Sequence, residues 1–188
     1  MSPVTHFLAG WLLAAPMRIS GREKVFIVAA AVIPDVDGLG IIPELLTRNS
    51  AHPLLWFSQY HHSLHTLVFA LVVTLLCWCM AEQRWKTAFL VMLSFHFHLL
   101  CDVLGSRGPD GDSWPIPYLS PISDSLELSW HGQWALNGWQ NILITALMLS
   151  ATFWIAYRYG SSPLELASAR ANRRFVHVLR SRFGNRDS

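Results

Sequence analysis

Histidine and aspartate residues that could bind a metal ion lie within apolar parts of this sequence. His98 and Asp102 are four residues apart in the apolar segment 87–104, so a helix there would present both side chains on one face. A neutral imidazole and a carboxylate directed at one point can bind a zinc-type ion. A hydrogen-bonded structural pair would have the same spacing, so this pair alone leaves both interpretations open.

Three further histidines, His61, His62 and His65, stand at the head of the apolar segment 65–81. On a helix, either His61 or His62 would share a face with His65, and either pair could chelate an ion. The alternative is a set of surface histidines near a helix start. Three imidazoles within five residues, beside a membrane segment, favour ligation.

The apolar segment 25–42 is interrupted by a short polar sequence that contains Pro34, Asp35, Asp37 and Gly38. Proline removes a helical hydrogen bond, so a break is expected here, and a broken helix could direct one or both carboxylates inward. The alternative is a loop at the membrane edge with two solvated aspartates. His6, near the start of the apolar stretch 6–17, is a weaker candidate of the same kind.

The composition indicates that these residues belong to an integral membrane protein. Of 188 residues, 52% are hydrophobic and only 14% are charged, against about 25% charged in typical soluble domains. Residues 64–81 and 141–157 carry no formal charge, and roughly 20 apolar helical residues span a bilayer. We therefore predict an all-α bundle of four to five membrane-embedded helices, at 6–17, 25–42, 65–81, 87–104 and 139–157. The first of these is short and need not span.

The distribution of basic residues predicts how this bundle is oriented. Twelve of the fourteen Lys and Arg residues lie in alternate connections, around 18–24 and 84–86 and after residue 157. Short basic connections stay in the cytoplasm, so the N-terminus is predicted outside and the C-terminus inside. In this topology the candidate ligands from four separate stretches fall toward the outer membrane face.

We divide the chain into a membrane-embedded domain, residues 1–160, and a basic tail, residues 161–188. In the tail, Leu166, Phe175, Val178 and Leu179 alternate with arginines, a pattern typical of an amphipathic helix on anionic lipids of the cytoplasmic leaflet. A solvated basic end that only fixes the topology is the alternative. Nucleic-acid binding is not expected.

Four sequence motifs together resemble a known family. They are THFLAG with His6, IPDVDG with Asp35 and Asp37, HHSLHTL with His65, and HFHLLCDVLGSRGPDGDSWPI with His98 and Asp102. The combination resembles the membrane-bound, metal-dependent hydrolases whose bacterial members include LexA-regulated inner-membrane proteins, and the likeness spans residues 6–117. A more distant similarity to zinc-dependent phospholipases C and fungal single-strand nucleases implies phosphoester hydrolysis.

The resulting hypothesis is a multi-pass hydrolase of the bacterial inner membrane that holds a divalent ion, zinc by preference. Its substrate would be a lipid or lipid-linked phosphate at the outer face. Asp37 would act as general base or orient a ligand, and His131 would contact the substrate or protonate the leaving group, unless it is a loop residue without a role. The candidate metal ligands are His6, Asp35, His61, His62, His65, His98 and Asp102.

Two other functional classes use similar residues. Paired histidines on membrane helices can be axial haem ligands, although the accompanying carboxylates suit zinc, magnesium or manganese better. A metal or proton transporter would need polar groups in both halves of the membrane, whereas the inner half of this bundle is predicted to be apolar. His96 is about 200° around the helix from His98, so we predict that it packs outside the site.

Overall fold

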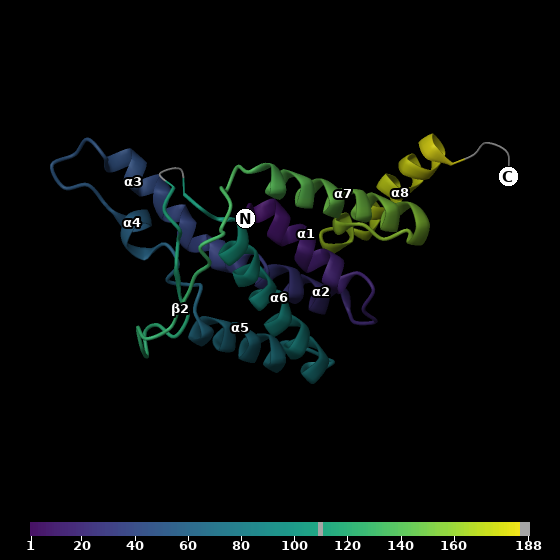
Figure 1. Cartoon of the computed structure of the whole chain (residues 1–188). Coiled ribbons are helices and arrows are strands. Elements are labelled where there is room, and N and C mark those ends of the chain that lie inside the picture. The colour runs from purple at the N-terminus through teal and green to yellow at the C-terminus, as the bar shows by residue number, and fades with distance from the viewer. Residues whose placement is uncertain (109–110, 185–188) are drawn as a thin grey trace.

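The computed structural model describes residues 1–108 and 111–184, and within them the chain is mainly helical, as predicted (Figure 1). Residues 185–188, the end of the predicted tail, lie outside the described part. The helices are α1 (Pro3–Ala14), α2 (Gly21–Ala30), η1 (Ile33–Gly40), α3 (Ile41–Thr47), α4 (Trp56–Tyr60), α5 (Leu67–Met80), α6 (Arg84–Gly105), α7 (Trp139–Tyr159), η2 (Pro163–Leu166) and α8 (Ala169–Phe183). A small antiparallel pair, β1 (Ile116–Pro117) and β2 (Glu127–Leu128), lies in the loop between α6 and α7.

Helix α6 is the centre of the bundle, because α1, α2 and α5 all pack against it, and α7 packs on α1. The core between these helices is apolar, and the side chains of Trp11, Ile27 and Val91 are fully buried. The opposite faces of α5 and α7 expose large apolar side chains, among them Leu75 and Leu147. Apolar residues on both the inner and the outer faces are what a lipid environment requires.

Helices α1, α2 and α6 approach closely beside the candidate site. A Cβ atom added at Gly10 would lie 2.7 Å from the Cβ of Ala31 and 3.2 Å from the Cα of Val28. On the facing side, the Ser94 hydroxyl donates a hydrogen bond of 2.8 Å to the Ile27 carbonyl. Small residues thus allow α1 to lie against α2, one turn of helix beyond His6.

Two helices, α6 and α7, are long and apolar enough to cross a membrane, and α2 with η1–α3 forms a third candidate that is bent by 47°. The 12 residues of α1 and the 14 of α5 reach only about 18 and 21 Å at 1.5 Å per residue, short of the ~30 Å hydrocarbon core. Segment 65–81 is therefore shorter as a helix than predicted, because Thr66 caps its start and the backbone at Ala81 is extended.

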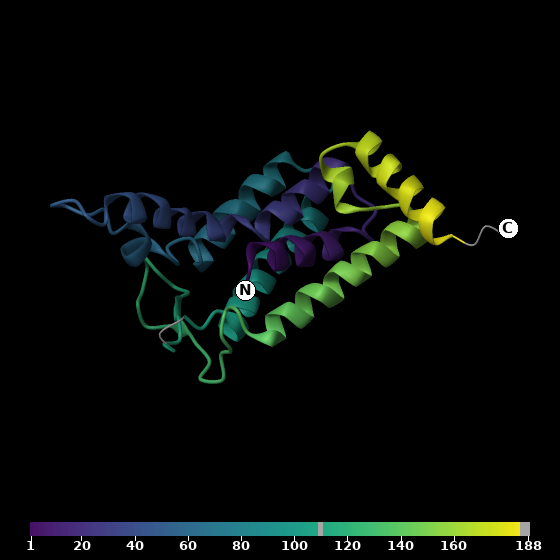
Figure 2. The ribbon, with the colours of Figure 1, turned by 90° about the horizontal axis from the view of Figure 1, so that it is seen from above.

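The predicted break in segment 25–42 is confirmed. Helix α2 ends at Ala30, and residues 33–40 form the 3-10 helix η1 with Pro34 in its first turn. This change of helix type accompanies the bend that carries Asp35 and Asp37 to the end of the bundle where α6 ends. Beyond it, α3 and α4 extend away from the remaining helices (Figures 1 and 2).

The prediction that His61, His62 and His65 share a helix is wrong. Helix α4 ends at Tyr60, and the chain passes through turns until Thr66 caps α5 by accepting a hydrogen bond of 3.2 Å from the Phe69 amide. Their ring positions are therefore set by turns and not by helical spacing. His62 has a φ of 79°, in the left-handed region that non-glycine residues seldom adopt.

At the opposite end of the bundle, the basic connections meet one another. The side chains of Gln83 and Lys86 donate to the Arg18 carbonyl at 2.9 and 3.3 Å, and Lys24 pairs with Glu165 at 3.0 Å. The connections before α2, before α6 and after α7 therefore lie together at one end of the bundle, as the charge pattern predicts. Helix α8 crosses the C-terminal end of α7 there (Figures 1 and 2).

Candidate metal centre

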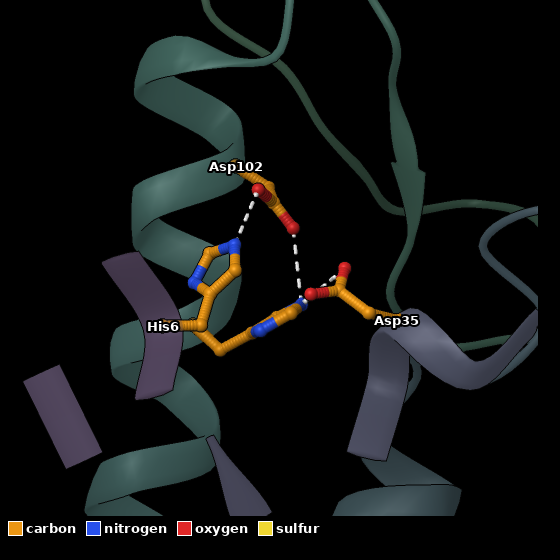
Figure 3. A group of neighbouring side chains, drawn as sticks. His6, Asp35 and Asp102 are labelled. Atoms are coloured by element: carbon orange, nitrogen blue, oxygen red, sulfur yellow. Dashed lines mark hydrogen bonds and ion pairs between the residues drawn. The ribbon is translucent and has the colours of Figure 1, made fainter. Parts of the chain in front are cut away.

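Three helices bring four of the predicted ligands together. His6 from α1, Asp35 from η1, and His98 and Asp102 from α6 each offer one ligand atom, and these atoms lie within 4.8 Å of one another (Figure 3). His98 Nε2 is 3.0 Å from Asp102 Oδ2, so the spacing of four along α6 does bring this pair together. His6 Nε2 is 3.2 Å from the other carboxylate oxygen of Asp102, and His98 Nε2 is 3.8 Å from Asp35 Oδ1.

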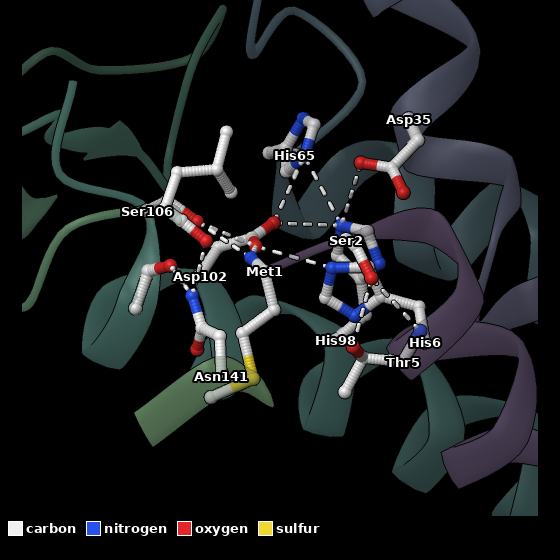
Figure 4. A network of polar contacts seen from close by, with 12 residues as sticks. Met1, Ser2, Thr5, His6, Asp35, His65, His98, Asp102, Ser106 and Asn141 are labelled. Atoms are coloured by element: carbon white, nitrogen blue, oxygen red, sulfur yellow. Dashed lines mark hydrogen bonds and ion pairs between the residues drawn. The ribbon is translucent and has the colours of Figure 1, made fainter. Parts of the chain in front are cut away.

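His65 reaches the same cluster from the turn before α5. Its Nε2 lies 3.1 Å from Nε2 of His98 and 3.5 Å from Asp102 Oδ2 (Figure 4). The side chain is buried, with 1% of its surface exposed. A fifth predicted ligand thus belongs to the cluster, although turns rather than a helix position it.

The ring orientations of His65 and His98 are set by the partners of their Nδ1 atoms. His98 Nδ1 donates to the Ala31 carbonyl at 2.8 Å, and His65 Nδ1 donates to Asp37 Oδ2 at 3.3 Å. With Nδ1 occupied in this way, each ring directs its Nε2 at the cluster, which is how metal-binding histidines are usually oriented. Around a tetrahedral zinc ion with bonds of 2.0–2.1 Å, ligand atoms lie about 3.3 Å apart, close to the 3.1 Å between these nitrogens.

The charge of the cluster also favours a cation. Asp35, Asp37 and Asp102 contribute three carboxylates, and within the described residues their ion-pair partners are histidines and the amino group of Met1. Oδ2 of Asp35 and Oδ1 of Asp37 are buried without a hydrogen-bond partner. Buried carboxylates are costly unless they are paired or bind a metal. The imidazole and carboxylate donors present fit a zinc-type divalent ion.

Asp37 connects η1 to the histidine-containing turns. Besides His65, its carboxylate accepts from the Leu64 amide at 3.1 Å and lies 3.3 Å from His61 Nδ1. Asp37 thus contacts the candidate ligand His65 at Nδ1, the ring nitrogen on the side away from His98. In this position a carboxylate orients the imidazole and raises its basicity.

A cavity of about 320 Å³ adjoins the cluster and is reached by Asp35 and Asp102. Its remaining wall is largely apolar and aromatic, with Leu39, Phe57 and Trp114 among the lining residues. His61 packs between Phe57 and Trp114, at ring-centre distances of 4.5 and 5.0 Å. The cluster therefore has beside it a space large enough for a small polar group and bordered by apolar surface.

His61 and His62 line this cavity and are not among the four residues that converge within 4.8 Å. His62 makes no side-chain hydrogen bond to the part of the chain that the structure describes. Burial, together with the charges of His61 and His65, lowers the pKa of His62 to about 3. Its ring is therefore neutral at physiological pH.

The two remaining histidines of interest lie away from the cluster. His131 is on an exposed turn, where its backbone carbonyl accepts from Arg107 at 3.0 Å, and it does not line the cavity. His96 faces away from His98, as predicted: its Nδ1 donates to the Met92 carbonyl, and its Nε2 lies 2.8 Å from the Tyr118 hydroxyl. It links α6 to the long loop.

Several residues of the site did not enter the sequence-based prediction. Ser106 donates to Asp102 Oδ1 at 2.8 Å, and the amino group of Met1 contacts both residues (Figure 4). Gln133 donates to the Asp102 carbonyl at 2.8 Å. Ser106 continues the spacing of four from His98 through Asp102, so the sequence carried a signal for it. Gln133 lies in a loop, where no such periodicity exists.

Comparison with known proteins identifies the family. A family model described as YdjM inner membrane protein matches residues 1–178. The chain belongs to the YdjM inner membrane protein family. The match includes α1, η1, α6 and the turn with His65, so every residue of the cluster lies in the part shared with this family. No curated protein and no solved structure matches the chain.

Proposed function

We propose that this member of the YdjM family is a membrane-bound, metal-dependent hydrolase that cleaves a phosphoester of a lipid or lipid-linked substrate. The observation that carries the proposal is the arrangement of His65 and His98. Two imidazoles direct their Nε2 atoms at one point, 3.1 Å apart, among three carboxylates and beside a cavity. Two nitrogens this close need a proton or a metal ion between them, and the surrounding carboxylates favour a metal ion.

His65, His98 and Asp102 would hold the ion, with Asp35 and His6 completing its surroundings. When bound, a divalent ion activates water near neutral pH and neutralises charge on a phosphoryl oxygen. Asp37 orients His65 through Nδ1, and Ala31 does the same for His98. Asp35 directs a carboxylate without a hydrogen-bond partner on Oδ2 at the cavity edge, where it can accept a proton from attacking water.

The surroundings of the cavity support an amphiphilic substrate. Leu39, Phe57 and Trp114 border it, and Val36, Ile42 and Leu45 on η1 and α3 expose apolar side chains nearby. A phosphate group in the cavity could therefore have its lipid portion against this apolar surface. The basic connections lie at the other end of the bundle, so we place the cluster at the outer membrane face and α8 in the cytoplasm.

A transporter is less well supported than a hydrolase. Between the cluster and the basic end of the bundle, the space between α1, α2 and α6 is filled by Trp11, Ile27 and Val91, all fully buried. A path for ions across the membrane requires polar groups along its length. At this depth the described core holds no ionisable side chain, and the buried Ser94 hydroxyl there is already bonded to the Ile27 carbonyl.

Metal content is the measurement that tests the proposal. Purified wild-type protein in detergent is loaded with zinc, manganese or magnesium, and bound metal is measured by mass spectrometry beside His98→Ala, Asp102→Ala and His96→Ala. We expect near-stoichiometric metal in the wild type and His96→Ala, and its loss from the two cluster variants. His96 is the matched control because it is on the same helix outside the cluster.

Metal-loaded protein is then assayed for phosphate release from phosphatidic acid and lipid pyrophosphates. Turnover that requires both the metal and Asp102 supports the proposal. Absence of metal from folded wild-type protein would overturn it, and metal without turnover of any phosphoester would leave a metal-binding membrane protein that is not a phosphohydrolase.

A further inference from the structure

Helix α8 is firmly attached to the bundle at the end of α7. Asn172 accepts hydrogen bonds from the amide and hydroxyl of Ser162, at 2.8 and 2.7 Å, and donates to the Gly160 carbonyl at 2.9 Å. Phe175 packs on Phe153 of α7 at 5.8 Å, and Val176 is buried. One face of α8 is therefore fixed against α7 and the turn that follows it.

The opposite face of α8 is strongly basic. At 100° per residue, five basic side chains fall within an arc of about 120°. All are exposed: Arg170, Arg173, Arg174, His177 and Arg180. No acidic residue occurs between Ala169 and Phe183, and the nearby Glu165 is already paired with Lys24 at 3.0 Å. The helix thus presents an uncompensated positive surface at the end of the bundle.

Part of this surface is hollowed. A groove of about 570 Å³ is lined by Arg173, His177, Arg180 and Ser181, with Gly160 and Val176 at its base. Arg180 is held in place because its Nε donates to the Tyr157 carbonyl at 2.8 Å. Two guanidinium groups and an imidazole therefore border one space, a donor set that suits the oxygens of a phosphate.

The groove also lies at the depth expected of lipid headgroups. It adjoins the C-terminal end of α7, a helix long enough to cross the membrane, and this end carries Trp154, Tyr157 and Tyr159. Tryptophan and tyrosine concentrate at membrane–water interfaces. The cytoplasmic leaflet contains anionic lipids, which attract arginines close to the surface.

We propose that this groove binds the phosphate of an anionic phospholipid headgroup. Arg173 and His177 are the groups available to the phosphate, and Arg180 supplies further charge from its fixed position. The site is separate from the metal centre, which lies at the other end of the bundle, so it does not depend on hydrolase activity.

The test compares two variants with the same change in charge. Full-length protein in detergent is titrated with phosphatidylglycerol or phosphatidylcholine, and bound lipid is measured by native mass spectrometry for the wild type, Arg173→Gln and Arg174→Gln. Arg174 is on the same basic face but does not line the groove. We expect preference for phosphatidylglycerol, about tenfold weaker binding for Arg173→Gln, as loss of a charged hydrogen bond predicts, and a much smaller change for Arg174→Gln.

Three outcomes would overturn the proposal. Equal losses in the two variants would mean diffuse attraction to a basic surface without a defined site. Equal binding of phosphatidylcholine would exclude recognition of an anionic headgroup. Complete competition by inorganic phosphate at the same concentration as the lipid would indicate a site for a free anion. Circular dichroism of both variants checks that α8 remains folded.

Discussion

At the scale of single residues, two roles were predicted for Asp37: general base, or partner of a metal-binding histidine. Its hydrogen bond to His65 distinguishes between them. As general base, Asp37 would act on water in the cavity and leave metal affinity unchanged on substitution. As the partner of His65 Nδ1, at 3.3 Å, it would fix the orientation of a candidate metal ligand. The contact with the Leu64 amide on the same oxygen favours the second role.

We predict that Asp37→Asn weakens metal binding by about 10- to 100-fold, the usual effect of removing a carboxylate behind a ligating histidine. The measurement is a competitive zinc titration with a chromophoric chelator on folded protein. Unchanged affinity combined with lost turnover would instead identify Asp37 as the general base.

The backbone of His62 is in the left-handed region, where an L-residue has a steric cost that glycine does not have. An L-residue in the left-handed region costs roughly 1–2 kcal/mol, and glycine gives back about 0.5–1 kcal/mol as extra entropy of the unfolded chain. We predict that His62→Gly raises the melting temperature slightly in detergent. His62→Ala, which keeps the steric cost, should not raise it; equal stabilisation by both would show that the ring, and not the backbone, is responsible.

The sequence allowed the α6 ligands to be predicted because His98 and Asp102 follow helical spacing. His6 was predicted as a ligand from its motif, and Asp35 from its motif and from the helix break at Pro34. The sequence did not predict how His61, His62 and His65 lie, since these residues are in turns whose geometry depends on η1 and on Trp114. Spacing rules for helices do not apply there.

At the scale of helices, Glu23 is a structural feature that the sequence analysis overlooked. Its buried carboxylate accepts from the amide and hydroxyl of Ser20, closing a capping box at the start of α2. It also accepts from the Gln83 amide at 2.7 Å and from the Thr87 hydroxyl at 2.9 Å. One side chain thus caps α2 and attaches it to the start of α6.

We predict that Glu23→Ala destabilises the protein by about 3 kcal/mol, because several donors to a charged group lose their buried acceptor. The exposed neighbour Glu82 provides the control, and Glu82→Ala should change stability by less than about 0.5 kcal/mol. Thermal unfolding in detergent, followed by tryptophan fluorescence, measures both. Equal stability of the two variants would contradict the structural role of Glu23.

The order and boundaries of the helices were largely accessible from hydropathy, because apolar runs and Pro34 determine where helices can continue. The length of helix α5 was overestimated. Its apolar run begins before the helix does, since His65 is directed to the histidine–aspartate cluster and Thr66 caps the helix. Contacts at the start of the segment therefore make the helix shorter than the apolar run.

At the scale of the whole molecule, the two ends of the bundle differ in charge. The candidate metal centre and its cavity lie where α6 ends, and the basic connections and α8 lie where α6 begins. Membrane insertion keeps basic connections in the cytoplasm. We therefore predict that the candidate site faces the outer side of the membrane, in an orientation set by residues that lie outside the site.

Labelling of introduced cysteines tests this orientation. In a variant with Cys77, Cys79 and Cys101 replaced by alanine, Ser125→Cys places a thiol on the exposed loop between α6 and α7, and Ala169→Cys places one at the start of α8. A membrane-impermeant maleimide should label the first in intact cells and the second only after permeabilisation. The reverse pattern would put the metal centre in the cytoplasm.

The ligands are also spread along the chain in a way that affects how the protein is made. His6 is in the first helix, whereas His98 and Asp102 are near the end of α6, with Asp35 and His65 between them. During synthesis the chain emerges from its N-terminus, so His6 and Asp35 are made long before their partners. The complete cluster forms only after α6 has been made and packed against α1. If the cluster binds an ion, as we propose, its loading is a late step of biogenesis, and a chain whose α6 has not yet packed cannot hold it.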